Sequence, residues 1–163
     1  MPHISLNSAF GSLTVFEEAG VLVAVEWGRA GEGPGEREAG ETPLLVEARK
    51  QMRAYFAGRL KEFDLPLAAK GTDFQVAAWR AMSGIPYGVT KTYSDIARGL
   101  ASGPRAVGTA CARNPLPIIV PCHRVVGLRG RLGGYTGSGG IATKKALLRL
   151  EGALTSGGGG LKS

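Results

Sequence analysis

A cysteine followed directly by a histidine, Cys122-His123, is the pair of residues in this sequence best suited to chemistry. A cysteine is a nucleophile only as the thiolate, and a nearby histidine or positive charge favours that state. The alternative is a small buried cysteine beside a surface histidine. The pair lies within LPIIVPCHRVVG (residues 116–127), whose apolar, β-branched residues predict a buried strand interrupted by Pro121.

The expected strand limits how the two residues can cooperate. Neighbours in an extended strand point to opposite faces, so Cys122 and His123 cannot easily form a direct dyad without a sharp turn or a water between them. This favours a slow, stoichiometric nucleophile over a hydrolase that turns over. A third group should orient His123. Glu151 is the acidic residue of this half with a predicted buried position at a helix end.

The cysteine and histidine content argues against other sites. The chain has two cysteines, Cys111 and Cys122, and two histidines, His3 and His123. A disulfide scaffold of this length would need more cysteines. No CxxC pair exists and His3 is remote in sequence, so we expect no metal.

The charge of the chain is divided unevenly along its length. Residues 1–66 contain ten acidic and seven basic residues, whereas residues 67–163 contain three acidic and thirteen basic ones, within a total of +7. A basic half indicates a polyanionic partner, nucleic acid first, or otherwise a solvated basic face. No apolar run of 18 residues and no secretion signal are present. We therefore expect a soluble cytoplasmic protein, associated with the nucleoid if the host is a prokaryote.

The first part of the chain predicts a small α/β domain over residues 1–68. SLTVFEE and VLVAVEW (residues 12–18 and 21–27) flank Ala19-Gly20 and indicate a hairpin. Apolar residues at helical spacing follow Pro43, and Gly58 ends that helix. Residues 62–68 predict a last strand.

The second part, residues 69–154, predicts short helices and carries the candidate chemistry. Thr72 with Gln75 and Thr92 with Asp95 form capping boxes at two helix starts. A further helix would begin with Ser102 as its cap, have Pro104 in its first turn and run to about residue 113. Two short helices around a Gly-containing turn suggest a helix-turn-helix.

The second helix of that motif is rich in small residues, and an amphipathic helix closes the domain. Ala106, Gly108 and Thr109 would let the helix backbone approach a minor groove closely, or simply pack against a neighbouring helix. The last helix, over residues 141–151, would turn leucines 147, 148 and 150 inward. We expect a disordered tail over residues 155–163.

Four segments together resemble the O6-alkylguanine-DNA alkyltransferases (methylated-DNA–protein-cysteine methyltransferases). They are GTDFQVAAWRAMSGIPYGVTKTYSDIA, RAVGTACARNPLPIIVPCHRVVG, GGYTG and KKALLRLEG, in this order. They cover residues 67–152 densely, and the N-terminal part resembles the family loosely. The resemblance implies an RNase H-like α/β domain with a small antiparallel sheet, followed by a mostly helical, winged-helix-like domain.

The family resemblance implies repair of DNA by direct reversal of damage. Cys122 would take the alkyl group of O6-alkylguanine, mainly O6-methylguanine and also O4-methylthymine, from a base flipped out of the duplex. The product is a thioether without a carbonyl for water to attack, so the protein is spent after one event and needs no cofactor. His123 would be the general base through a water, with Glu151 on its other ring nitrogen. The protein would be a monomer in solution and could assemble cooperatively on duplex DNA.

The remaining roles that the resemblance implies concern the active-site turn, the pocket and the DNA. Asn114 would brace the turn, or cap a helix C-terminus, and Tyr93 would donate a proton toward the guanine, or be a core aromatic. Arg105 would fill the gap left by the flipped base, or contact a phosphate. The base pocket would comprise Pro117, Val125, Tyr135, Thr136, Lys144 and Cys111. The DNA contacts would come from Arg105, Ala106, Gly108, Thr109, Thr72, Gln75, Tyr93 and Arg124.

Two departures from the family pattern concern the pocket. The segment YTGSGGIATK (residues 135–144) is two residues longer than usual, and Cys111 stands where an apolar or small residue is common. Cys111 would line the pocket or act as a second alkylatable thiol. The alternatives in function are a protein that flags alkylated DNA without repair, a helix-turn-helix regulator and a cysteine hydrolase. The first lacks the cysteine in known cases, the second does not explain PCHR, and the third needs a direct dyad.

Overall fold

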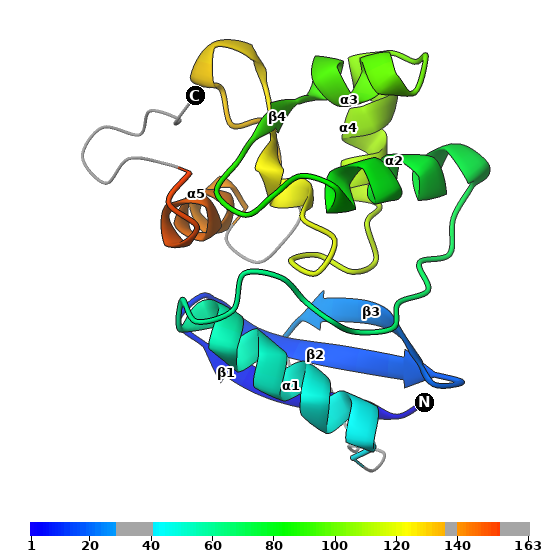
Figure 1. Ribbon diagram of the computed structural model, residues 1–163, viewed down its shortest axis with the longest axis vertical. Coiled ribbons are helices and arrows are strands. Elements are labelled where there is room, and N and C mark those ends of the chain that lie inside the picture. Colours follow the sequence, from blue (N-terminus) through cyan, green and yellow to red (C-terminus); the bar gives the residue numbers. More distant parts are fainter. Residues whose placement is uncertain (29–40, 136–139, 154–163) are drawn as a thin grey trace. The chain divides into compact units, whose positions relative to one another are not determined.

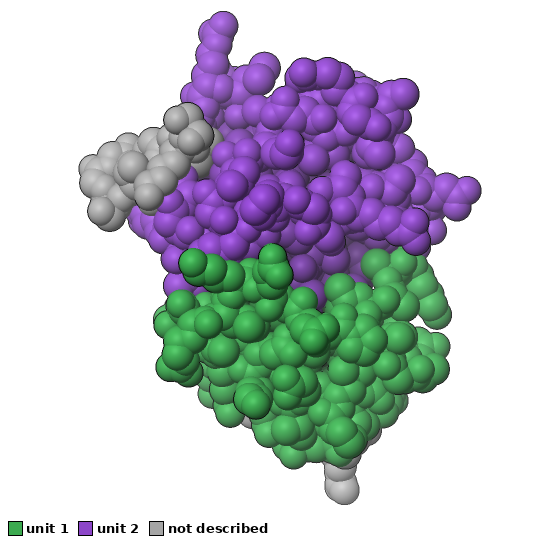
Figure 2. All heavy atoms as spheres, viewed as in Figure 1, with its two compact units in different colours: residues 1–70 green, residues 71–163 purple. Residues whose placement is uncertain are grey.

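The computed structural model describes residues 1–28, 41–135 and 140–153 of the chain (Figure 1). They belong to two compact units, residues 1–70 and 71–163, coloured separately in Figure 2. The expected disordered tail, residues 155–163, lies outside the described residues, as does Thr136. None of the helices in the described ranges is long and apolar enough to cross a membrane.

The first unit is an antiparallel three-stranded sheet with one helix packed on it (Figure 1). Strands β1 (His3–Ser8), β2 (Gly11–Glu18) and β3 (Val21–Trp27) pair in chain order. The predicted hairpin is confirmed, and Ala19 and Gly20 both have positive φ, as a tight turn of this type requires. Helix α1 (Pro43–Phe56) begins with a Thr42 cap and buries Leu45, Ala48, Met52 and Tyr55.

The strand predicted over residues 62–68 is wrong. Only Leu67 forms a bridge, parallel to Leu22 of β3. The backbone N–H of Asp64 donates to Gln51 Oε1 at 2.9 Å, and its carbonyl accepts from Gln51 Nε2 at 3.0 Å. Pro66 has no N–H to donate. A side chain of α1 therefore occupies the backbone groups that a strand would have needed.

The second unit begins with three helices that pack against one another. Helices α2 (Asp73–Ser83), α3 (Tyr93–Gly99) and α4 (Pro104–Ala112) contact each other, and Trp79 Nε1 donates to Ala110 O at 2.8 Å. Both predicted capping boxes are present, at the start of α2 and of α3. The predicted Ser102 cap is wrong, because Gly103 is the N-cap of α4 and no side chain caps it.

The buried strand predicted around the nucleophile is also wrong in form, although the segment is buried. Cys122–Arg124 forms a single 3-10 turn, η1, after Pro121, which has no N–H for a strand. The segment keeps one short strand, β5 (Val125–Val126), which pairs in parallel with β4 (Lys91–Thr92). Helix α5 (Ile141–Leu150) closes the unit with Leu147 and Leu148 buried, whereas Leu150 is half-buried. The backbone at Cys122 and His123 therefore forms a tight turn in place of the extended strand.

Candidate active site

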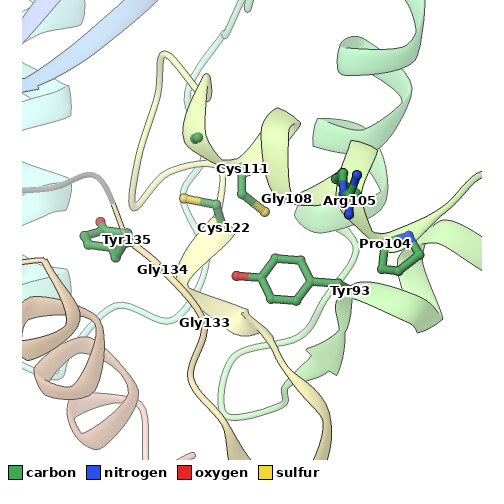
Figure 3. A pocket seen from close by; sticks show the side chains of 10 residues that line it. Tyr93, Pro104, Arg105, Gly108, Cys111, Cys122, Gly133, Gly134 and Tyr135 are labelled. Carbon is green, nitrogen blue, oxygen red and sulfur yellow. The ribbon is translucent and has the colours of Figure 1, made fainter.

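A pocket of about 670 Å³ opens onto Cys122 in the second unit (Figure 3). Its wall combines η1, the start of α3, one face of α4 and the glycine-rich loop that follows β5. The lining residues are Tyr93, Pro104, Arg105, Gly108, Cys111, Ala112, Cys122, Gly133, Gly134 and Tyr135. Segments remote in sequence therefore meet around Cys122, and Cys111 places a second thiol in the same pocket.

Asn114 holds the turn that presents Cys122. Its Nδ2 donates to Val120 O at 2.8 Å, and its Oδ1 accepts from Leu116 N at 2.9 Å. Burial raises the pKa of the Cys122 thiol, and a hydrogen bond from Asn114 and the charge of Lys144 act in the opposite direction. Cys122 is 5% exposed. It is therefore protonated at neutral pH unless a base removes its proton.

The two residues that follow Cys122, His123 and Arg124, share one buried carboxylate. His123 Nε2 lies 2.7 Å from Glu151 Oε2. Arg124 Nε donates to Glu151 Oε1 at 2.8 Å and its Nη2 to Oε2 at 3.0 Å, while Nη1 donates to Ile85 O at 2.7 Å. Arg124 therefore makes a bidentate ion pair with the carboxylate that also orients His123.

The protonation states of this cluster follow from its geometry. Burial raises the pKa of Glu151, but hydrogen bonds and charges of His123 and Arg124 outweigh it and lower the pKa to about 2. Burial lowers the pKa of His123. A carboxylate can only accept, so His123 Nε2 must carry the hydrogen and Nδ1 keeps a free lone pair. Nδ1 is buried without a protein partner among the described residues, which suits a general base.

Lys144 of α5 joins the pocket wall to the active-site turn. Its Nζ donates to Val125 O at 2.7 Å, to Gly134 O at 3.3 Å and to the Tyr93 hydroxyl at 3.4 Å. Burial lowers the pKa of Lys144 to about 8. Burial, followed by the charges of Cys111 and Cys122, raises the pKa of Tyr93 to about 12, so its phenol keeps its proton.

Helix α4 presents its first turns beside the pocket mouth. Arg105 and Gly108 line the pocket, Thr109 is exposed and Ala106 is half-buried. Thr109 Oγ1 donates to Arg105 O at 3.2 Å, which satisfies its hydroxyl within the helix. Thr72 and Gln75 bond each other in the capping box of α2. Contacts of these residues with DNA stay predictions.

Several expected site residues are placed differently. Arg124 is wrong as a DNA contact, because its guanidinium is buried and bonded to Glu151 and Ile85. Pro117 is not among the residues that line the pocket, and the Val125 carbonyl accepts from Lys144. Thr136 lies outside the described residues. Within the described ranges, no group of three or more His, Cys, Asp or Glu residues could hold a metal ion.

Gly133 and Gly134 line the pocket, although neither was predicted as a site residue. Gly133 has a φ of 73°, and a Cβ added there would collide with the hydroxyl and ring of Tyr93. Figure 3 shows the Tyr93 hydroxyl directed at this stretch of backbone and at Cys122. The glycine density of residues 127–140 was the available signal, since glycine is favoured where the backbone approaches another group closely.

Two family models cover nearly the whole chain. The ribonuclease-like domain of 6-O-methylguanine DNA methyltransferase matches residues 1–69, and its DNA-binding domain matches residues 73–153. The chain belongs to the 6-O-methylguanine DNA methyltransferase family. It is 43% identical over 156 residues to the constitutive methylated-DNA–protein-cysteine methyltransferase of Bacillus subtilis, covering 91% of this chain and 94% of the relative.

Other members of the 6-O-methylguanine DNA methyltransferase family agree with this assignment. The Mycobacterium tuberculosis methyltransferase is 43% identical over 150 residues, or 90% of each chain. The crystal structure of Mycobacterium tuberculosis OGT in complex with DNA matches with a TM-score of 0.82 at 42% identity and covers 93% of each chain. The expected fold class is confirmed, and the chain is an alkyl-transferring DNA-repair enzyme, a methylated-DNA–protein-cysteine methyltransferase.

Proposed function

We propose that this methyltransferase moves the alkyl group of O6-alkylguanine irreversibly onto Cys122 Sγ, once per molecule. O6-methylguanine is the main substrate and O4-methylthymine a second one. One observation carries the proposal: Cys122 lines a pocket, and the next residue, the neutral His123, is buried and held by Glu151, with no partner for its Nδ1 among the described residues. This arrangement supplies a nucleophile, a base and an orienting group at one place.

The proposed reaction moves one proton and one alkyl group. His123 Nδ1 takes the proton of the Cys122 thiol through a bridging water, and the thiolate attacks the alkyl carbon. The S–C bond forms as the C–O6 bond breaks, and the guanine takes a proton from Tyr93 as it leaves. The Tyr93 phenol is then restored by the proton that His123 acquired. The thioether that remains cannot be hydrolysed like a thioester, so no second turnover follows.

The target base must leave the duplex to reach Cys122, because the thiol is buried at the pocket wall. We propose that Arg105, exposed at the start of α4, occupies the space that the base leaves in the stack. The small residues Ala106 and Gly108 let the helix lie close to a minor groove. Lys144 stabilises the loop and the negative charge that develops on the base.

Duplex DNA is the proposed partner of residues 69–154, which would bind it and transfer the alkyl group, while residues 1–68 form a separate α/β domain. The relative from Mycobacterium tuberculosis was solved in complex with DNA. Residues 71–163 carry twelve basic and three acidic residues, which suits a polyanion. We propose a monomer that can assemble cooperatively on DNA.

Mass spectrometry tests the proposal directly. Incubation with a duplex containing O6-methylguanine should add one methyl group per protein molecule, and peptide mapping should place it on Cys122 rather than Cys111. Cys122→Ser should bind the same duplex without gaining mass, whereas Cys111→Ser should be methylated like the wild type. Repeated turnover contradicts the proposal. DNA binding without any mass change would instead indicate a protein that flags lesions.

A further inference from the structure

A second depression adjoins the Cys122 pocket and is not used by the proposed reaction. It measures about 440 Å³ and is lined by the start of α3, by Pro104 and by the loop after β5. Its lining residues are Thr92, Tyr93, Ser94, Pro104, Gly127, Leu128, Arg129 and Arg131. We call it the arginine groove. Tyr93 and Pro104 line both cavities, so the groove and the pocket share a wall.

The loop of the arginine groove has a defined shape. Gly127 N donates to Arg131 O at 2.7 Å, and Arg131 N donates to Leu128 O at 3.3 Å. Arg129 has a φ of 58°, a left-handed conformation in which glycine or asparagine is favoured. The left-handed backbone conformation at residue 129 therefore does not explain why an arginine stands there. The closed loop holds both arginines on the rim of one cavity.

Both guanidinium groups are available to an anion. Arg129 and Arg131 are exposed, and in the part of the chain that the structure describes no carboxylate forms an ion pair with either. Asp95 is the acidic residue on the α3 side of the groove, and its carboxylate accepts from Arg98 Nη2 at 3.1 Å and from Thr92 N at 3.0 Å. Arg124, by contrast, is neutralised by Glu151 in the interior.

Polar and apolar groups of the arginine groove also fit a nucleotide backbone. The Thr92 oxygen accepts from Asp95 N, which leaves its hydroxyl hydrogen to donate, and Ser94 adds a second hydroxyl. Leu128 is 62% exposed and offers an apolar surface to a sugar. Two arginines and hydroxyl donors are the groups that bind phosphate oxygens in DNA complexes.

We propose that the arginine groove binds one backbone phosphate of the lesion-bearing strand, next to the target nucleotide. This rests on the proposed function, because a base in the Cys122 pocket must leave its own backbone at the shared wall formed by Tyr93 and Pro104. Arg129 and Arg131 then act as positioning residues for DNA. They do not touch the reacting atoms.

The test compares DNA with a free base that has no phosphate. The variant is Arg129→Ala/Arg131→Ala, and the control is Arg53→Ala/Arg59→Ala, which removes two exposed charges from the first unit. We expect the variant to bind duplex about tenfold more weakly. The plot of log K against log salt concentration should become shallower by about 0.9, the change expected for one lost phosphate contact. Alkylation by free O6-benzylguanine should keep its wild-type rate, which also shows that the variant is folded.

Neutral methylphosphonate linkages locate the phosphate without any protein variant. The linkages are placed one at a time along the lesion strand. The linkage next to the target nucleotide should weaken wild-type binding about tenfold, whereas the affinity of the arginine variant should not change. An unchanged salt slope, or equal losses in the two double variants, overturns the proposal, as does a scan without a sensitive linkage. If the wild type is alkylated by neither DNA nor free base, the proposed function itself fails.

Discussion

Glu151 Oε2 lies 2.7 Å from His123 Nε2, with both side chains fully buried. The same oxygen accepts from Arg124 Nη2 at 3.0 Å, so one carboxylate serves two cationic or donor partners. The bond fixes the histidine tautomer and turns Nδ1 into the free base. This contact joins the C-terminal end of α5 to the nucleophile turn, 28 residues away in the chain.

Replacement of His123 by Gln should slow alkyl transfer from DNA by about 10²- to 10⁴-fold, because the variant lacks the base that removes the Cys122 proton. Single-turnover kinetics with a labelled duplex would measure this. DNA affinity should stay within twofold of the wild type. Raising the pH should recover part of the variant's rate, since hydroxide can ionise the thiol. A merely structural defect would show no such recovery.

Acid should destabilise the protein through Glu151. Its pKa is about 2 in the folded protein against an ordinary value of 4.5, so the unfolded chain binds the proton first. The resulting stability is present above pH 4.5 and is lost as the pH falls toward 2. Between pH 6 and pH 3 the loss should be about 2 kcal/mol. The lowered pKa of His123 adds a loss that begins below pH 6.5.

Urea unfolding at pH 6 and pH 3 measures that loss. Glu151→Gln should be less stable than the wild type at pH 6 and should lose about 2 kcal/mol less on acidification. The exposed Glu62→Gln is the matched control and should follow the wild type. If the free energy of unfolding depended on pH equally in the wild type and in Glu151→Gln, the acid sensitivity could not be assigned to Glu151.

Arg105→Ala should impair transfer from duplex DNA by about tenfold or more while leaving transfer from single strands and free base nearly unchanged. The reason is that only a duplex leaves a gap in the stack when the base is flipped. Arg105 is exposed, so the fold should be unaffected. Arg53→Ala serves as a charge-matched control. Equal rates for Arg105→Ala and wild type on duplex would exclude the gap-filling role.

Gly133→Ala should disturb the pocket through Tyr93. The added Cβ would collide with the Tyr93 hydroxyl and ring, and the residue has a φ of 73°. We expect the rate of alkylation by free O6-benzylguanine to fall about tenfold or more as Tyr93 is displaced. Gly58→Ala is the control, because it has a similar φ of 76° and open space around its Cβ. Equal rates in the two variants would contradict the prediction, because the collision with Tyr93 would then have no effect on the pocket.

Local sequence determined the helices, the hairpin and the family to which the chain belongs. The Thr72–Gln75 and Thr92–Asp95 boxes act over three residues, so their interaction energies depend on local spacing alone. The hairpin at Ala19-Gly20 is local in the same sense. The family motif around Cys122 also lies in one short segment, and both family models confirm the assignment.

Only the tertiary structure decided which contacts the charged and apolar residues around that motif make. Arg124 was expected to contact DNA and is instead bonded to Glu151. A buried carboxylate requires a charged or hydrogen-bonding partner, and no local sequence pattern indicates which residue that partner is. The strand predicted at Cys122 is a 3-10 turn, since Pro121 and the Asn114 bonds divert the backbone. The arginine groove likewise exists only where the loop after β5 meets α3. Such contacts depend on the distances between remote segments, which spacing along the chain does not specify.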